Sequence, residues 1–177
     1  LSRYRGRDPF CDPFCGSGTI PIEAALIAKN RAPGLDRSFA AQKWKTMPGT
    51  LWLDAAEEAM DKEFHGSYDI WGGDIDPAAV ELSRHNAALA GVEDCVRFEV
   101  ADAGKFHRES AYGQLVTNPP YGERLLEKTE AEALYRRFGA AARTLPPGWR
   151  VVVLSSHTEF ERAFGRPADK KRKLYNG

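Results

Sequence analysis

Short apolar runs alternate with longer amphipathic stretches along the chain. Five runs are typical of buried strands and end on polar residues; they cover residues 10–14, 68–74, 95–100, 114–117 and 149–154. Helical spacing of apolar residues predicts helices over residues 19–29 and 77–90, and a third that opens with a capping box of Thr129 and Glu132. This alternation predicts an α/β fold with a mostly parallel, twisted sheet that helices cover on both faces.

The stretch between the first helix and the second strand interrupts this alternation. Pro33-Gly34 and Pro48-Gly49 break the chain there, and only an acidic surface helix over residues 54–64 is predicted. We therefore expect one domain over residues 1–177 with an irregular insertion at about residues 30–67.

The last residues are typical of a hairpin. Residues 171–175 alternate like a short strand and run into Asn176-Gly177, a dipeptide favoured in type I′ turns because both positions accept a positive φ. No returning strand follows in the sequence. We therefore expect the chain to be a fragment of a longer protein, with the last hairpin strand of its sheet missing.

Composition and charge exclude several classes of protein for this chain. The chain is 42% hydrophobic and 28% charged, which favours a globular domain over a disordered one. Its 25 Lys and Arg balance 25 Asp and Glu, which argues against binding nucleic acid by bulk charge alone. Without a membrane-length apolar run or a leader sequence, we expect a cytoplasmic protein with no membrane partner.

Three residue types are assigned no catalytic role. The three cysteines, Cys11, Cys15 and Cys95, include no CxxC pair, so we expect buried, reduced thiols and no metal site. No histidine has a Ser or Cys partner at a recognisable spacing. The four tryptophans are assigned to packing; they are Trp44, Trp52, Trp71 and Trp149.

Basic residues gather near both ends of the chain. They are Arg3, Arg5, Arg7, Arg162, Arg166, Lys170, Lys171, Arg172 and Lys173. These side chains could contact phosphates or form an ordinary solvated surface, and the sequence leaves both interpretations open.

A glycine turn lies between the first strand and the first helix. It is Asp12-Pro13-Phe14-Cys15-Gly16-Ser17-Gly18-Thr19, and its glycines let a nucleotide-like ligand approach the backbone at a helix N-terminus. It lacks the Gly-Lys-Ser/Thr of a Walker A loop, and Pro21 stands where a dinucleotide fingerprint has its third glycine. ATP and NAD are therefore disfavoured.

Carboxylates follow the next two strands. Asp74 is expected to accept hydrogen bonds from ribose hydroxyls, and Asp102 from the exocyclic amine of an adenine ring. Asp76 precedes Pro77 and is explained as a helix N-cap. The three loops together predict an adenosine-type ligand.

The fourth predicted strand runs into Asn118-Pro119-Pro120-Tyr121. Consecutive prolines fix φ and remove two backbone donors, which leaves a rigid edge rich in acceptors. The Asn118 side-chain oxygen and the Pro119 carbonyl can hold the N–H groups of a nucleobase amine and direct its lone pair at an electrophile. Tyr121 can stack on the base.

These motifs resemble those of S-adenosylmethionine-dependent amino-methyltransferases. The fuller runs DPFCGSGTIPIEAALIAKNRAPGL, FAAQKW, TNPPYGERL and KRKLYNG are similar to the bacterial 23S rRNA guanine-N2 methyltransferase family, often labelled N6-adenine DNA methylases. The resemblance implies a Rossmann-like class I methyltransferase fold. The residues it implies for S-adenosylmethionine binding are Asp12, Pro13, Cys15, Gly16, Ser17, Gly18, Thr19, Asp74, Ile75, Asp102, Ala103 and Asn118.

The implied reaction is direct methyl transfer to an exocyclic amine of a base in RNA, with guanine N2 of 23S rRNA as the target. Asn118, Pro119, Pro120 and Tyr121 would form the catalytic clamp. The family carries an upstream RNA-binding THUMP domain that is absent from this chain. Three alternatives stay open: an adenine-N6 DNA methyltransferase, a protein glutamine methyltransferase, and a non-catalytic RNA-binding module with a vestigial cofactor pocket.

Overall fold

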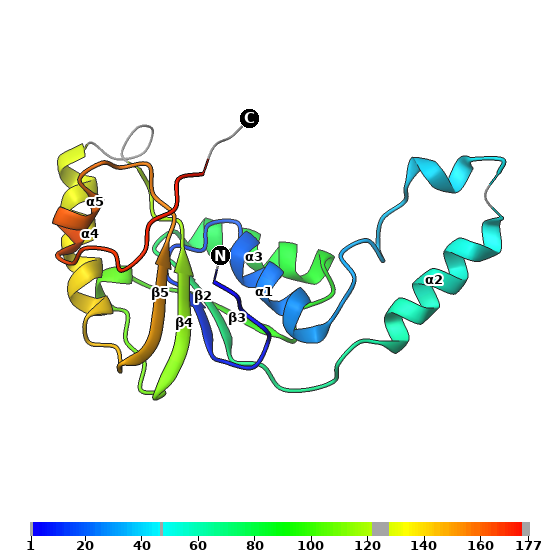
Figure 1. Cartoon of the computed structure of the whole chain (residues 1–177), viewed down its shortest axis with the longest axis horizontal. Helices are drawn as coiled ribbons and strands as arrows, with labels where there is room; N and C mark the ends of the chain where they lie inside the picture. The colour runs from blue at the N-terminus through cyan, green and yellow to red at the C-terminus, as the bar shows by residue number, and fades with distance from the viewer. Residues whose placement is uncertain (1, 47, 122–127, 175–177) are drawn as a thin grey trace.

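The computed structural model describes residues 2–46, 48–121 and 128–174. Five parallel strands form one sheet in the order β3-β2-β1-β4-β5 (Figure 1). They are β1 (Phe10–Asp12), β2 (Ile70–Asp74), β3 (Val96–Val100), β4 (Tyr112–Thr117) and β5 (Gly148–Val153). The strand order reverses between β1 and β4, so a topological switch point lies where their carboxyl ends meet.

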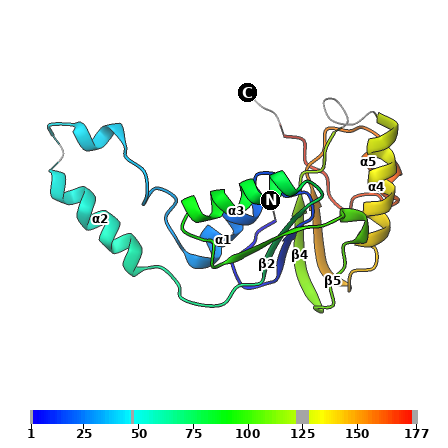
Figure 2. The same ribbon diagram turned by 180° about the vertical axis from the view of Figure 1, so that it is seen from behind.

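Helices cover both faces of the sheet, as the sequence predicts. α1 (Thr19–Lys29) and α3 (Pro77–Leu89) lie on one face, and α4 (Lys128–Ala142) and α5 (Phe160–Phe164) on the other (Figure 2). A short 3-10 helix, η2 (Ala103–Lys105), packs beside α4. This is the doubly wound arrangement that places ligands at the carboxyl edge of the sheet.

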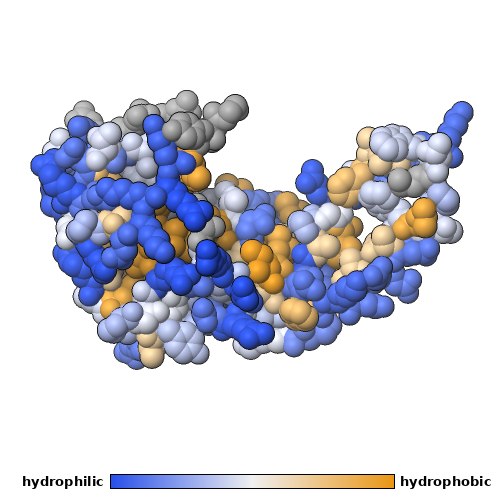
Figure 3. Space-filling view, in the orientation of Figure 1, coloured by the Kyte–Doolittle hydropathy of each residue, from blue (hydrophilic) through white to orange (hydrophobic). Residues whose placement is uncertain are grey.

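Within residues 30–67, the described residues 30–46 and 48–67 form an arm that extends away from this body. The arm contains the 3-10 helix η1 (Ala40–Lys43) and the helix α2 (Gly49–Asp61), and neither has a buried residue. The predicted acidic helix is therefore present, but it begins and ends earlier than expected. Figure 3 shows apolar side chains on the arm surface.

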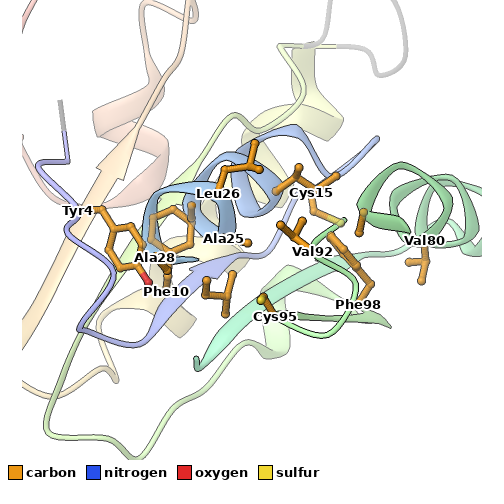
Figure 4. Close-up of a cluster of buried hydrophobic side chains, with 14 residues drawn as sticks. Tyr4, Phe10, Cys15, Ala25, Leu26, Ala28, Val80, Val92, Cys95 and Phe98 are labelled. Atoms are coloured by element: carbon orange, nitrogen blue, oxygen red, sulfur yellow. The ribbon is translucent and has the colours of Figure 1, made fainter. Parts of the chain in front are cut away.

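Two hydrophobic cores hold the body together. One lies between the sheet and α1 and α3, around Phe10, Val80 and Phe98 (Figure 4). The other lies between the sheet and α4, where Leu115 and Phe138 are both 0% exposed. Both layers bury apolar side chains, which explains why the central strands are continuously apolar.

Local signals fix the helix ends near the switch point. The Asp76 side chain accepts a hydrogen bond from the Ala78 amide at 2.9 Å and Pro77 is the first helical residue, which confirms the predicted cap of α3. α1 begins after Gly18, whose φ is +83°. A Cβ there would lie 2.8 Å from the Ser83 Cβ, so both backbone and packing require glycine.

Two predictions for the C-terminal third of the chain are wrong. Thr129 lies inside α4, which already includes Lys128, and is therefore not its N-cap. The Glu132 carboxylate lies 3.6 Å from Arg162 and 3.8 Å from Arg136. Residues 171–174 form no strand, and the Lys171 ammonium lies 2.6 Å from the Glu161 carboxylate of α5. The predicted turn and Tyr175 lie outside the described residues.

The three cysteines are free and buried, as predicted. Burial raises the pKa of the Cys15 thiol to about 12 and that of Cys11 to about 11. No described helix is long and apolar enough to cross a bilayer. Within residues 2–46, 48–121 and 128–174, no group of three or more potential ligands could hold a metal ion.

Candidate active site

The glycine loop is attached to the carboxyl end of β2. The Cys15 amide donates to the Gly73 carbonyl at 2.9 Å, and the Gly16 amide donates to Asp74 Oδ2 at 3.0 Å. The other oxygen of Asp74 accepts from the Asp76 amide at 3.0 Å. Asp74 therefore joins the loop to the start of α3, a local role that the sequence did not suggest.

Asp74 keeps capacity for a further partner. Each carboxylate oxygen can accept two hydrogen bonds, and one is used on each oxygen. The side chain is half-buried at the edge of the sheet. Its two amide bonds fix its orientation, and the remaining lone pairs match the two hydroxyls of a ribose.

Gly16 leaves open space at the start of α1. Its φ is +53°, and a Cβ built on it would meet nothing within 4 Å. The exposed hydroxyls of Ser17 and Thr19 lie beside it, 3.1 Å apart. A ligand can approach the backbone here at a helix N-terminus, which favours an anionic group such as a carboxylate.

A buried carboxylate connects the two halves of the site. Asp12 is 1% exposed, and its Oδ1 accepts from the Phe14 amide at 3.0 Å and from the Thr117 hydroxyl at 2.5 Å. Burial, with a smaller contribution from the Asp74 charge, raises the pKa of Asp12 to about 7 against the lowering effect of these two hydrogen bonds. Asp12 is thus fixed by the residue that precedes Asn118.

The predicted clamp follows directly at the end of β4. Pro119 is fully buried and Asn118 is exposed, so the Asn118 amide faces outward from a rigidly held backbone. The Tyr121 hydroxyl donates to Asn118 Oδ1. An amide oxygen has two lone pairs, so Asn118 can accept a second hydrogen bond from a base amine.

The residues after β3 are engaged locally. Asp102 caps η2 by accepting from the Gly104 amide at 2.8 Å, and it lies 3.4 Å from Arg137. Ala103 is 5% exposed and packs in the second core, whereas Ile75 is 69% exposed at the edge of β2. Of these three, the Ile75 side chain is the most accessible to a ligand.

Sequence reasoning missed two residues of this region, Thr117 and Tyr135. The Tyr135 side chain is buried, its hydroxyl donates to the Pro120 carbonyl, and burial raises its pKa. Its ring contacts Phe160, with centroids 4.8 Å apart. The available signal was its spacing of three from Phe138, because a tyrosine on a buried helix face needs a partner for its hydroxyl.

Comparisons with known proteins place these features in context. The family described as UPF0020: RMKL-like, methyltransferase domain matches residues 1–177. A Bacillus subtilis (strain 168) protein, provisionally named RNA methyltransferase YpsC, is 44% identical over 181 residues, covering 100% of this chain and 46% of the relative. Ribosomal RNA large subunit methyltransferase K/L of Shewanella baltica (strain OS185) is 41% identical, covering 94% of this chain and 24% of the relative.

A solved structure agrees over the whole chain. SMU.472, provisionally assigned as a methyltransferase and complexed with SAH, has a TM-score of 0.94 and 42% identity, and covers 100% of this chain and 47% of its own. The chain therefore spans less than half the length of these relatives.

Proposed function

The chain belongs to the family of RMKL-like methyltransferase domains, and on that premise we propose that it methylates an exocyclic amine of a base in RNA, with guanine N2 of 23S rRNA as the target. S-adenosylmethionine is the cofactor, as the family and the SAH-bound neighbour imply. SAH is what S-adenosylmethionine becomes when it gives up its methyl group. An rRNA substrate would place the protein in the cytoplasm.

The residues of the glycine loop fit this cofactor. The open space beside Gly16 would admit its methionine carboxylate at the N-terminus of α1, and the spare lone pairs of Asp74 would accept its ribose hydroxyls. Ile75 would offer an apolar surface to the nucleoside. When bound, S-adenosylmethionine supplies an electrophilic sulfonium methyl group.

The clamp would prepare the amine. The lone pair of an exocyclic amine is delocalised into its ring, so the amine is a weak nucleophile until its geometry is fixed. Asn118 Oδ1 and the Pro119 carbonyl would accept its two N–H groups, and Tyr121 would stack on the base. The chain would act mainly by positioning the base, which must leave its stack to reach the clamp.

One observation carries the proposal. The hydrogen bond from Thr117 to Asp12 joins residues that lie 105 positions apart, and it places the glycine loop beside Asn118 at the switch point. A cofactor on the loop and a base on the clamp would therefore meet. Affinity for RNA would come in part from an upstream THUMP-type domain, which the length of the relatives can accommodate.

The test is to incubate unmodified ribosomal RNA with the full-length protein and S-adenosylmethionine and to map the product by mass spectrometry. We expect one N2-methylated guanine with the wild-type protein, formed about 100-fold more slowly with the Asn118→Ala variant. Methylated adenine in duplex DNA, with unmodified RNA, would favour the DNA methyltransferase. Absence of S-adenosylmethionine binding in calorimetry would favour a non-catalytic RNA-binding module.

A further inference from the structure

The arm carries its charges in two separate halves. Residues 37–53 contain three cations and no acid, whereas residues 54–63 contain five acids and one lysine. The three cations, Arg37, Lys43 and Lys45, form no ion pair with any residue in the described part of the chain. Residues 37–45, which we name the basic limb, are therefore a local positive surface on a neutral protein.

Trp44 stands in the middle of this charge. It is 61% exposed, whereas Trp71 is 5% exposed in the body. This exposure shows that the prediction of a packing role for Trp44 is wrong. Inside the arm it is Trp52 that packs, with its ring centroid 5.3 Å from that of Phe39. An exposed indole between two lysines combines a stacking surface with partners for phosphates.

The basic limb lies on the side of the molecule where a substrate would enter. In Figure 1 the outer end of the arm curves toward the side on which β4 and β5 end. Figure 3 shows that the surface is concave between the arm and the body. An RNA strand whose target base lies in the clamp could cross this concavity and reach the basic limb.

We propose that the basic limb binds single-stranded RNA next to the target base, with Trp44 stacked on an unpaired base and Lys43 and Lys45 on phosphates. The proposal rests on the proposed function in taking RNA as the substrate. A single strand fits better than a duplex, because only an unstacked base exposes a face to an indole.

The experiment compares Trp44→Ala and a Lys43→Gln, Lys45→Gln double variant with wild type, all in the full-length protein. Binding to an unstructured single-stranded RNA is measured at several salt concentrations, and methylation of ribosomal RNA in parallel. We expect Trp44→Ala to weaken binding roughly 10-fold and raise the KM for RNA, with kcat and S-adenosylmethionine affinity unchanged. The double variant loses two phosphate contacts to a single strand, which should reduce the salt slope by about 1.4.

Leu53→Ala is the matched control, because Leu53 is an arm residue that is 71% exposed but lies outside the basic limb. RNA binding equal to wild type in both limb variants would overturn the proposal while leaving the proposed function intact. If Trp44→Ala loses RNA binding but the wild-type protein transfers no methyl group, the RNA-binding role of the basic limb would be supported and the proposed function refuted. A concentration-dependent oligomer abolished by Trp44→Ala, with RNA binding unchanged, would assign the surface to a protein partner instead.

Discussion

The body and the arm position their functional side chains in different ways. In the body, Asp12 and Tyr135 are buried, and each fixes a loop at the carboxyl edge through a hydrogen bond. In the arm, neither helix has a buried residue, and its root is held by polar contacts such as Arg31 to Glu63 at 2.5 Å. The difference suggests that precise chemistry belongs to the body and adaptable contact to the arm.

The largest contrast should appear in stability. Leu115 is 0% exposed and Leu53 is 71% exposed, so the same Leu→Ala change removes core packing at one position and almost none at the other. We expect Leu115→Ala to lower the free energy of unfolding by about 2–5 kcal/mol, and Leu53→Ala to change it by less than about 0.5 kcal/mol. Urea denaturation measures both, and equal losses would contradict the comparison.

Asn118 tests the clamp. Replacing it with alanine removes the side-chain oxygen that would hold the base amine, while the glycine loop keeps its contacts. We expect kcat to fall about 100-fold, the effect of losing a positioning group, with little change in the Kd for S-adenosylmethionine. Single-turnover kinetics and calorimetry separate the two, and an equal loss of both would disprove the assigned role.

A smaller effect should follow from the tyrosine behind the clamp. Tyr135→Phe removes the donor to the Pro120 carbonyl, so we expect kcat to fall about 10-fold, equivalent to about 1.4 kcal/mol, with S-adenosylmethionine affinity maintained. Tyr68→Phe is the matched control, since the Tyr68 hydroxyl also donates to a backbone carbonyl, that of Phe64 at 3.0 Å, at the root of the arm. Equal kcat values for the two variants would make Tyr135 merely structural.

The free energy of unfolding should depend on pH through the ionisation of Asp12. Its pKa rises from 3.8 to about 7 on folding, so the native state holds this proton more tightly than the unfolded state. Its contribution to stability is therefore complete below pH 3.8 and is lost as the pH rises to about 7. Asp12→Asn should remove this loss in denaturation experiments across that range, whereas Asp54→Asn on the exposed helix of the arm should not.

Much of the fold could be predicted because its signals are local. The five strands and α3, with its Asp76 cap and Pro77, follow from apolar runs and helix-start chemistry. The failures involve partners distant in sequence. Glu132, expected in a capping box, lies near Arg162 instead, and Lys171, expected in a strand, pairs with Glu161 of α5.

The candidate site divides in the same way. The sequence predicted Asp74 and Asn118 from their places after predicted strands, and the family resemblance implied Asp12. The sequence could not identify Thr117 or Tyr135, because each acts through a hydrogen bond to another loop, and that bond forms only when the chain folds. The expectation that Trp44 serves packing is wrong because its neighbours in sequence do not reveal how much of its side chain the folded arm leaves exposed.

The arm leaves and rejoins the body at a single place. The Phe64 amide donates to the Lys29 carbonyl at 2.7 Å, and the Asn30 side chain donates to the Lys62 carbonyl at 2.9 Å. In engineering terms, residues 30–63, which make up most of the arm, are a cassette whose two ends already touch. A short turn could replace it without stretching β1 or β2, and an arm of different sequence could be grafted onto the same catalytic body.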